Sequence, residues 1–363
     1  MNSEPNHALR LVFWELTARC NLACQHCRAE ALDHFAAGEL STAELIKVAG
    51  DIRAAGDPIM VLTGGEPLVR KDFFEIAGAC CGLFTRVALA TNGTLVDDDL
   101  ARRIKACGIK RVSVSLDGAC AATHDAFRRI PGCYQETLRG FDALRRAGES
   151  LQVNVTVAKH NIAEVADILN LALERGAEAF HVFVLVPVGC GAELAPELRL
   201  SPAEMEEILK WLFDKALELK SRLHIKATCA PQYYRIMQEV ARARKIAIRA
   251  EAHGMQALTR GCLAGSAVCF ISRIGDVQPC GYLPVRVGNA RERSFCEIWN
   301  EAEVFAALRD PGRLKGKCGV CGYRKICEGC RARAFVQTGD FLAEDPDCVY
   351  CPDGNYSAIQ ANN

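Results

Sequence analysis

Strand-like and helix-like segments alternate along the first half of the chain, and this alternation limits the fold more than any other feature. Six short apolar runs rich in Val, Ile and Leu have the composition of buried strands. They cover residues 11–17, 58–63, 86–91, 111–116, 151–157 and 180–186. Amphipathic segments with helical periodicity lie between them, at residues 41–55, 71–80, 96–107, 134–146 and 162–175. Strict alternation predicts an α/β fold with a parallel sheet and right-handed crossovers, either a partial barrel or an open sheet.

Three cysteines follow the first predicted strand directly. Cys20, Cys24 and Cys27 form a Cys-x3-Cys-x2-Cys motif. Thiolates are the ligands that iron–sulfur clusters select, and three of them leave one iron of a cubane open. A zinc site completed by His26 and a set of buried free cysteines are the alternatives. Because functional loops follow the carboxyl ends of parallel strands, we expect this motif at the functional edge of the sheet.

Turns with Gly, Asn or Asp follow the next three predicted strands. Gly64-Gly65-Glu66-Pro67 follows the second strand, Asn92-Gly93 the third and Asp117-Gly118 the fourth. Any one of these turns could simply be a tight connection between a strand and a helix. Their position at the same edge as the three cysteines indicates a shared site.

The chain has 20 cysteines, and their distribution separates ligand candidates from other thiols. Ten lie between Cys262 and Cys351, where several have the spacing of metal or cluster ligands. Seven others show no such spacing, and we interpret them as core or surface thiols. These seven are Cys80, Cys81, Cys107, Cys120, Cys133, Cys190 and Cys229.

Charge and hydropathy point to a cytoplasmic protein without nucleic-acid or membrane partners. Lys plus Arg and Asp plus Glu both number 44, so no global charge attracts polyanions. Residues 1–10 lack an apolar signal region, and no apolar run reaches membrane-spanning length. A reducing compartment also makes disulfides a poor explanation for so many cysteines.

Taken together, these motifs resemble those of the radical S-adenosylmethionine (SAM) enzymes. The likeness rests on residues 20–27, on residues 64–67 and on Ser113-Val114-Ser115-Leu116-Asp117-Gly118, and it covers residues 11 to about 190. It implies a partial (β/α)6 barrel. It also implies a [4Fe-4S] cluster that is held by the three cysteines and binds SAM through its open iron.

The resemblance further implies which residues bind SAM, whereas no catalytic residue is assigned. The expected cofactor-binding residues are Gly64, Gly65, Glu66, Pro67, Asn92, Ser115, Asp117, Arg128, Asn154 and Thr156. Among them, the segment 64–66 would meet the ammonium group of SAM, and Arg128 would meet its carboxylate. Residues of the fourth strand would meet the ribose, and Asn154 and Thr156 would line the adenosine with residues 184–187.

The C-terminal region resembles the SPASM domain, which carries two auxiliary [4Fe-4S] clusters. By that resemblance, one cluster would be held by Cys262, Cys269, Cys280 and Cys330, and the other by Cys318, Cys321, Cys327 and Cys348. Two residues separate Cys327 from Cys330 where the family has three, so the partition of ligands stays open. Cys351 could replace Cys348, and a zinc ribbon remains an alternative for this region.

Within this family the chain resembles the tetrapyrrole-modifying branch, and above all the haem synthases of the alternative pathway. The resemblance implies oxidative decarboxylation of two propionates of Fe-coproporphyrin III to vinyl groups, which gives haem b. A flavodoxin or ferredoxin would donate electrons, and the auxiliary clusters would either accept electrons or act as structural elements. Didecarboxysirohaem deacetylases, haem d1 enzymes and peptide-modifying SPASM enzymes are the alternatives.

The same resemblance implies a division of the chain and possible substrate contacts. We expect a barrel at residues 1–225, a helical bridge at 226–260, the SPASM-type domain at 261–351 and a tail at 352–363. An anionic porphyrin needs cationic partners. Candidates for substrate contact are Arg260, Arg286, Arg324, His253, Tyr233 and Tyr234, although an ordinary surface or helix residue is the better explanation for each.

Overall fold

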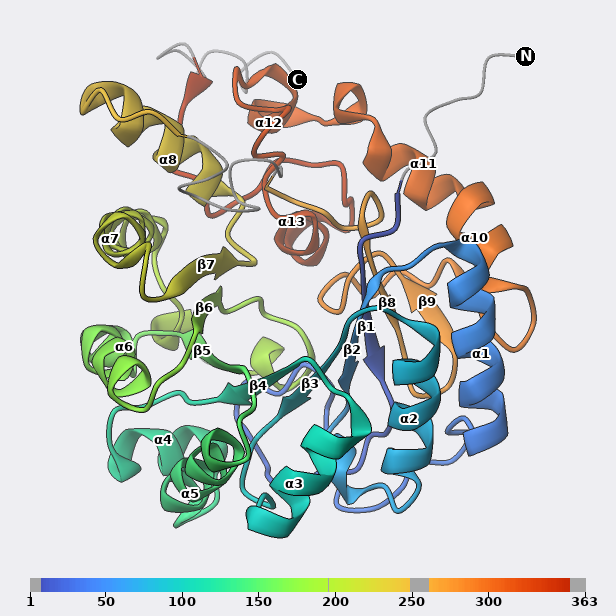
Figure 1. The fold of residues 1–363 in the computed structure, drawn as a ribbon. Helices are drawn as coiled ribbons and strands as arrows, with labels where there is room; N and C mark the ends of the chain where they lie inside the picture. The colour runs from blue at the N-terminus through green and yellow to red at the C-terminus, as the bar shows by residue number, and fades with distance from the viewer. Residues whose placement is uncertain (1–7, 195, 249–260, 353–363) are drawn as a thin grey trace.

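The computed structural model describes residues 8–194, 196–248 and 261–352, and it is built around one ten-stranded sheet (Figure 1). The strand order is β10-β9-β8-β1-β2-β3-β4-β5-β6-β7. The first seven strands are β1 (Leu11–Glu15), β2 (Ile59–Thr63), β3 (Val87–Thr91), β4 (Arg111–Ser115), β5 (Leu151–Val157), β6 (Ala179–Val184) and β7 (His224–Thr228). The other three are β8 (Val268–Ile271), β9 (Asp276–Gln278) and β10 (Gly288–Asn289).

Helices connect the parallel strands and cover the outside of the curved sheet (Figure 1). In this part they are α1 (Thr42–Ala55), α2 (Phe73–Leu83), α3 (Asp98–Cys107), α4 (Ala121–Arg128), α5 (Cys133–Arg146), α6 (Val165–Glu174) and α7 (Pro202–Leu219). The later helices are α8 (Gln232–Ala243), α10 (Phe295–Glu301), α11 (Glu303–Arg309), α12 (Gly316–Val320) and α13 (Arg331–Thr338). Short 3-10 helices lie at Pro67–Val69, Ile162–Glu164, Gly189–Ala192, Pro196–Leu198 and Pro311–Arg313.

Local sequence explains why the helices begin where they do. Ser41 caps α1, and its hydroxyl accepts from the amide of Glu44 while the Glu44 carboxylate accepts from the Ser41 amide. Ser201 and Glu204 make the same reciprocal pair at α7, where proline occupies the first turn. The main apolar core lies between the sheet and these helices, with Trp14 and Phe180 both fully buried.

The predicted α/β barrel with a C-terminal cysteine-rich part is confirmed, and all six predicted strands are present. The seventh strand, β7, was not predicted, and it runs parallel to β6. The expected helical bridge at 226–260 therefore begins inside β7 and continues into α8, and residues 249–260 lie outside the described residues. No helix of the described residues is long and apolar enough to span a membrane.

The C-terminal part is joined to the barrel through the sheet itself. β8 runs parallel to β1, with Leu11 opposite Val268 and Trp14 opposite Ile271. β9 and β10 then continue the sheet in antiparallel order. In Figure 1, α13 lies between the β7 side and the β8 side of the open barrel. This arrangement brings the C-terminal cysteines close to the carboxyl ends of the barrel strands.

Candidate active site

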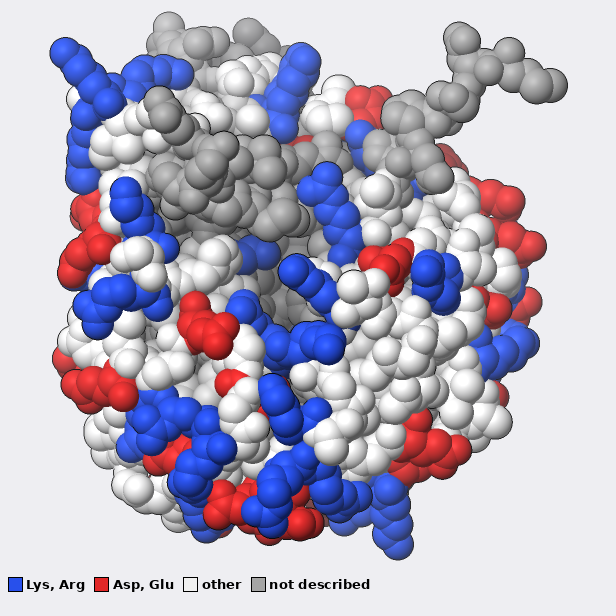
Figure 2. All heavy atoms as spheres, viewed as in Figure 1, with Lys and Arg blue, Asp and Glu red and all other residues white. Residues whose placement is uncertain are grey.

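A cavity of about 370 Å³ lies inside the barrel, where the C-terminal part meets the strands. Figure 2 shows a hollow near the centre of this face, with several Lys and Arg side chains around it. Most of the cavity wall is apolar, and seven cysteines line it. These are Cys20, Cys24, Cys27, Cys229, Cys262, Cys280 and Cys330.

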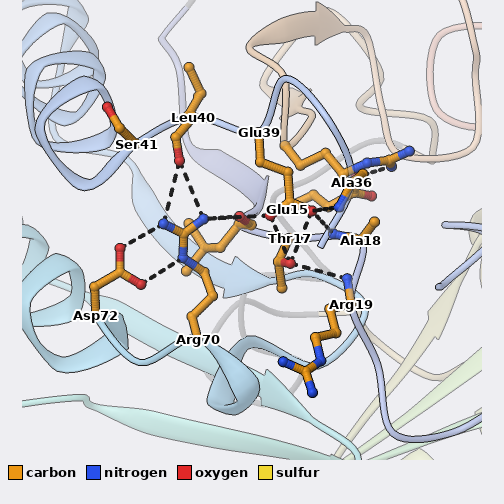
Figure 3. A network of polar contacts seen from close by, with 12 residues as sticks. Glu15, Thr17, Ala18, Arg19, Ala36, Glu39, Leu40, Ser41, Arg70 and Asp72 are labelled. Atoms are coloured by element: carbon orange, nitrogen blue, oxygen red, sulfur yellow. Dashed lines mark hydrogen bonds and ion pairs between the residues drawn. The ribbon is translucent and has the colours of Figure 1, made fainter. Parts of the chain in front are cut away.

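A network of polar contacts fixes the start of the loop that carries the first three cysteines (Figure 3). The carboxylate of Glu39 accepts hydrogen bonds from the Thr17 hydroxyl at 3.0 Å and from the Ala18 amide at 2.7 Å. Arg70 donates to the Leu16 carbonyl at 2.8 Å and forms an ion pair with Asp72 at 2.6 Å. Sequence reasoning missed Glu39 and Arg70, because neither belongs to a recognisable motif.

The two glycines after β2 allow that loop to pass very close to them. A Cβ atom on Gly65 would lie 2.4 Å from the Arg19 carbonyl oxygen, and one on Gly64 would lie 2.9 Å from that of Thr17. The Gly65 amide donates to the Thr17 carbonyl at 2.7 Å, and the Glu66 amide donates to the Arg19 carbonyl at 2.8 Å. These amides therefore position the cysteine loop. The ammonium group of SAM is a donor, so at residues 64–66 it would need acceptors such as the backbone carbonyl oxygens.

Glu66 is completely buried and joins two strand ends. Its carboxylate accepts from the Thr91 hydroxyl at 2.9 Å, the Asn92 amide at 2.8 Å and the Leu68 amide at 3.1 Å. Burial raises the pKa of Glu66 to about 7 against the opposing effect of these hydrogen bonds. Neither Glu66 nor Pro67 lines the cavity, whereas Gly64, Gly65 and Asn92 do.

Asp117 and Arg128 form a buried ion pair that also lines the cavity. Burial would raise the pKa of Asp117, but Arg128 and neighbouring donors lower it to about 2. The Arg128 guanidinium also contacts the Cys24 sulfur at 3.8 Å, where its charge favours a thiolate. Asp117 accepts from the Thr156 amide at 2.7 Å. Ser115, Asn154 and Thr156 line the same cavity, so the structure brings these predicted residues together.

The donors around the cavity fit an iron–sulfur cluster better than a single zinc ion. All 20 cysteines, which lie within the described residues, are free thiols. No three His, Cys, Asp or Glu side chains of the described residues lie close enough together to bind one metal ion. A zinc site would require such a group, with each sulfur at about 2.3 Å from the ion. His26, the suggested fourth zinc ligand, stacks on Phe127 and lies 3.5 Å from Asp117.

The remaining predicted ligands fall into two groups. Cys318, Cys321, Cys327 and Cys348 line a second, small cavity, as expected. Cys351 is exposed and does not line it. Cys262, Cys280 and Cys330 line the main cavity, but Cys269 is fully buried in the apolar core and does not. The zinc ribbon is not supported, because Cys330 lies apart from the other three cysteines that it requires.

Lys226 on β7 is a cavity residue that the sequence reasoning missed. It lines the main cavity next to Thr228. Its ammonium group forms no ion pair or hydrogen bond within the described residues. Burial lowers its pKa, because a charged amine loses hydration there. Thr228 presents a buried hydroxyl that also lacks a partner within the described part. A short strand with one lysine gave no sequence signal for this placement.

The other residues considered for substrate contact have different positions. Arg286 forms ion pairs with Asp276 and Glu292, and Arg324 lies at the second cavity. Tyr234 lines the main cavity, whereas Tyr233 is almost fully buried in the core. Arg260 and His253 lie outside the described residues.

Comparisons with known proteins agree with this geometry. The radical SAM superfamily matches residues 14–182, and the SPASM iron-sulfur cluster-binding domain matches residues 262–331. AdoMet-dependent heme synthase of Methanosarcina barkeri is 50% identical over 95% of this chain and 98% of its own length. AdoMet-dependent heme synthase of Nitratidesulfovibrio vulgaris is 45% identical over 94% of this chain and 93% of its own length. Pre-heme d1 synthase of Dinoroseobacter shibae is 33% identical over 93% of this chain and 85% of its own length.

Solved structures show the same fold. Streptococcus suis SuiB bound to the precursor peptide SuiA aligns with a TM-score of 0.73 at 16% identity, covering 95% of this chain and 76% of SuiB. anSMEcpe with bound AdoMet aligns with a TM-score of 0.67 at 19% identity, covering 93% of each chain. At such low identity the likeness concerns the fold alone. The identity to the relatives above is much higher, and it shows that the chain belongs to the AdoMet-dependent haem synthase family of radical SAM enzymes with a SPASM domain.

Proposed function

We propose that this enzyme decarboxylates two propionate side chains of Fe-coproporphyrin III to vinyl groups and so forms haem b. The observation that carries this proposal is the 50% identity to an AdoMet-dependent heme synthase over 95% of the chain. The two family matches, at residues 14–182 and 262–331, include the Cys20–Cys27 loop and the cysteines from Cys262 to Cys330. Membership of the radical SAM family implies a [4Fe-4S] cluster and SAM, and the SPASM domain implies auxiliary clusters.

The cavity supports a large, mostly apolar and anionic substrate. Its wall is predominantly apolar and includes Phe13, Phe183 and Phe270, as a macrocycle requires. Lys226 supplies a cation, and no carboxylate of the described residues forms an ion pair with it. We assign Lys226 to one propionate carboxylate of the substrate, because a half-buried unpaired ammonium is stabilised by an incoming anion.

Cys20, Cys24 and Cys27 would hold the SAM-binding cluster, which when loaded with SAM supplies the radical that removes a hydrogen atom. Around it, the cavity is lined by the predicted cofactor-binding residues Gly64, Gly65, Asn92, Ser115, Asp117, Arg128, Asn154 and Thr156. The Asp117–Arg128 pair fixes the wall beside Cys24, so it would orient the bound cofactor. Glu66 and Pro67 support these positions from behind the cavity surface.

Electron balance gives the auxiliary clusters a role. Each propionate that becomes a vinyl group loses one hydrogen atom and CO2, and one further electron must leave the substrate. The two C-terminal cysteine groups lie at and near the cavity, where bound clusters could accept that electron. A flavodoxin or ferredoxin would supply the electron that cleaves SAM. We also propose a cytoplasmic location, because a chain with 20 cysteines favours a reducing compartment. The expected boundaries at residues 225, 260 and 351 remain our domain proposal.

An anaerobic assay of the reconstituted enzyme with SAM, dithionite and Fe-coproporphyrin III tests this function. Mass spectrometry should show a porphyrin that has lost one and then two formic-acid equivalents, and the Cys20→Ala variant should abolish both products. Formation of 5′-deoxyadenosine with an unchanged porphyrin would refute the substrate while retaining the radical SAM chemistry. Sirohaem derivatives and peptides would then be tested in the same assay.

A further inference from the structure

Four cysteines from four separate segments meet at the edge of the main cavity. Cys229 follows β7, Cys262 precedes β8, Cys280 follows β9 and Cys330 precedes α13, and all four line the cavity. Cys229 and Cys280 also pack against the small apolar cluster that contains Cys330. The fourth sulfur near Cys262, Cys280 and Cys330 therefore belongs to Cys229.

Cys269, which the family pattern favours for this position, faces a different part of the molecule. Its neighbours in β8, Val268 and Phe270, both line the cavity. Side chains alternate along a strand, so Cys269 points to the other face of the sheet. There it is opposite Val12 of β1 and fully buried in the main apolar core.

A buried polar network holds Cys229 and Cys330 in place together. Cys229 has a φ of 58°, a left-handed conformation that a non-glycine residue keeps only where its surroundings fix it. Its carbonyl accepts from Arg333 at 2.6 Å. Arg333 pairs with the buried Asp345, whose carboxylate accepts from the Cys330 amide at 2.6 Å. The backbone at Cys229 is thus positioned by groups that also position Cys330.

We propose that Cys229, rather than Cys269, completes a four-thiolate site with Cys262, Cys280 and Cys330 for the auxiliary cluster beside the cavity. A cubane with four thiolates has no iron open to a substrate atom, so it would exchange electrons with the substrate without binding it. Three thiolates would instead leave an iron exposed to the cavity. This proposal does not depend on the identity of the substrate, because cluster ligation is measured without one.

Matched serine variants test the ligand set in the full chain. A background with Cys20, Cys24 and Cys27 changed to Ala removes the SAM-binding cluster and should leave about eight irons in two auxiliary cubanes. In this background we expect Cys229→Ser to lose up to about four irons or to change the EPR spectrum of the reduced protein. Cys269→Ser should alter neither. An unchanged Cys229→Ser variant, or a change in Cys269→Ser alone, would overturn the proposal.

Alkylation of the unmodified chain gives a second test that needs no variant to fold. Iodoacetamide is applied anaerobically before and after chelation of the iron, and mass spectrometry locates the labelled thiols. We expect Cys229 to be protected in the iron-loaded protein and labelled after chelation, because it lines an accessible cavity. Cys269 should resist labelling in both states, and the exposed Cys120 should react in both. Labelling of Cys229 in the loaded protein as fast as Cys120 would refute its role as a ligand.

Discussion

The replacement of Lys226 by Met tests whether the cavity is built for an anionic porphyrin. A unit charge pair at 4 Å is worth about 4 kcal/mol at the effective dielectric constant of a partly buried site. Removing one partner of a desolvated pair costs about 2–4 kcal/mol. Since 1.4 kcal/mol is a tenfold change in affinity, we expect Lys226→Met to weaken binding of Fe-coproporphyrin III about 30- to 700-fold.

The substrate-free protein should respond in the opposite direction. The ammonium group of Lys226 is desolvated and has no ion-pair partner within the described residues. Burial therefore lowers its pKa. Removing such a charge stabilises a fold, by about 0.5–2 kcal/mol at sites kept for function. Lys226→Met should therefore raise the thermal midpoint while it weakens binding. Loss of both stability and binding would indicate that Lys226 has a structural role.

Binding is measured anaerobically by titration of the Soret band with Fe-coproporphyrin III, and iron content is measured in the same preparations. Lys47→Met is the matched control, because Lys47 is exposed on α1 and lies outside the cavity lining. A screened surface charge changes binding by less than about 1 kcal/mol, or about fivefold. An effect of Lys226→Met below fivefold, with normal iron content, would refute its assignment to a propionate.

Four further changes test other parts of the structure. Gly65→Ala should lower iron incorporation and SAM cleavage severalfold, because its Cβ would meet the Arg19 carbonyl at 2.4 Å, whereas Gly78→Ala has open space and should not. Glu15→Gln should destabilise the protein by about 2 kcal/mol in urea unfolding, because buried Glu15 pairs with both Arg28 and Arg273 at 2.7 Å; an unchanged midpoint would contradict this. Cys348→Ser should lose about four irons and Cys351→Ser none, and the reverse result would exchange their roles. Burial lowers the pKa of His181, so the unfolded chain binds more protons below about pH 6.5 and wild-type stability falls as pH falls. Relative to His181→Gln, the wild type should lose up to about 1.4 kcal/mol per pH unit between pH 6.5 and 5.5, and parallel thermal midpoints would disprove it.

The barrel could be predicted from the sequence because its strands and helices each carry their own signal. The runs at 58–63 and 111–116 correspond closely to β2 (Ile59–Thr63) and β4 (Arg111–Ser115). β7 was missed because His-Ile-Lys-Ala-Thr is short and carries the polar side chains of Lys226 and Thr228 on its inner face. Those side chains face the cavity, so the functional site itself removed the apolar pattern that identifies a strand.

The candidate site was predictable where the ligands are close in sequence. Spacing alone placed Cys318, Cys321 and Cys327 around one small cavity. Cys229 lies 33 residues before Cys262 by sequence number and has no cysteine-rich surroundings. Only the pairing of β7 with β6 and the return of the chain to β8 bring it to the cavity, and these contacts have no local signature.

The place of β1 in the middle of the sheet has a consequence for biosynthesis. Its pairing with β2 joins residues about 48 positions apart, whereas its pairing with β8 waits for residues 268–271. Until that segment leaves the ribosome, one side of β1 has unpaired backbone groups, and such edges attract other strands. A chain that stops after α8 would keep this edge open, so we expect it to aggregate. We therefore expect the barrel and the SPASM part to fold together, although they match two separate families.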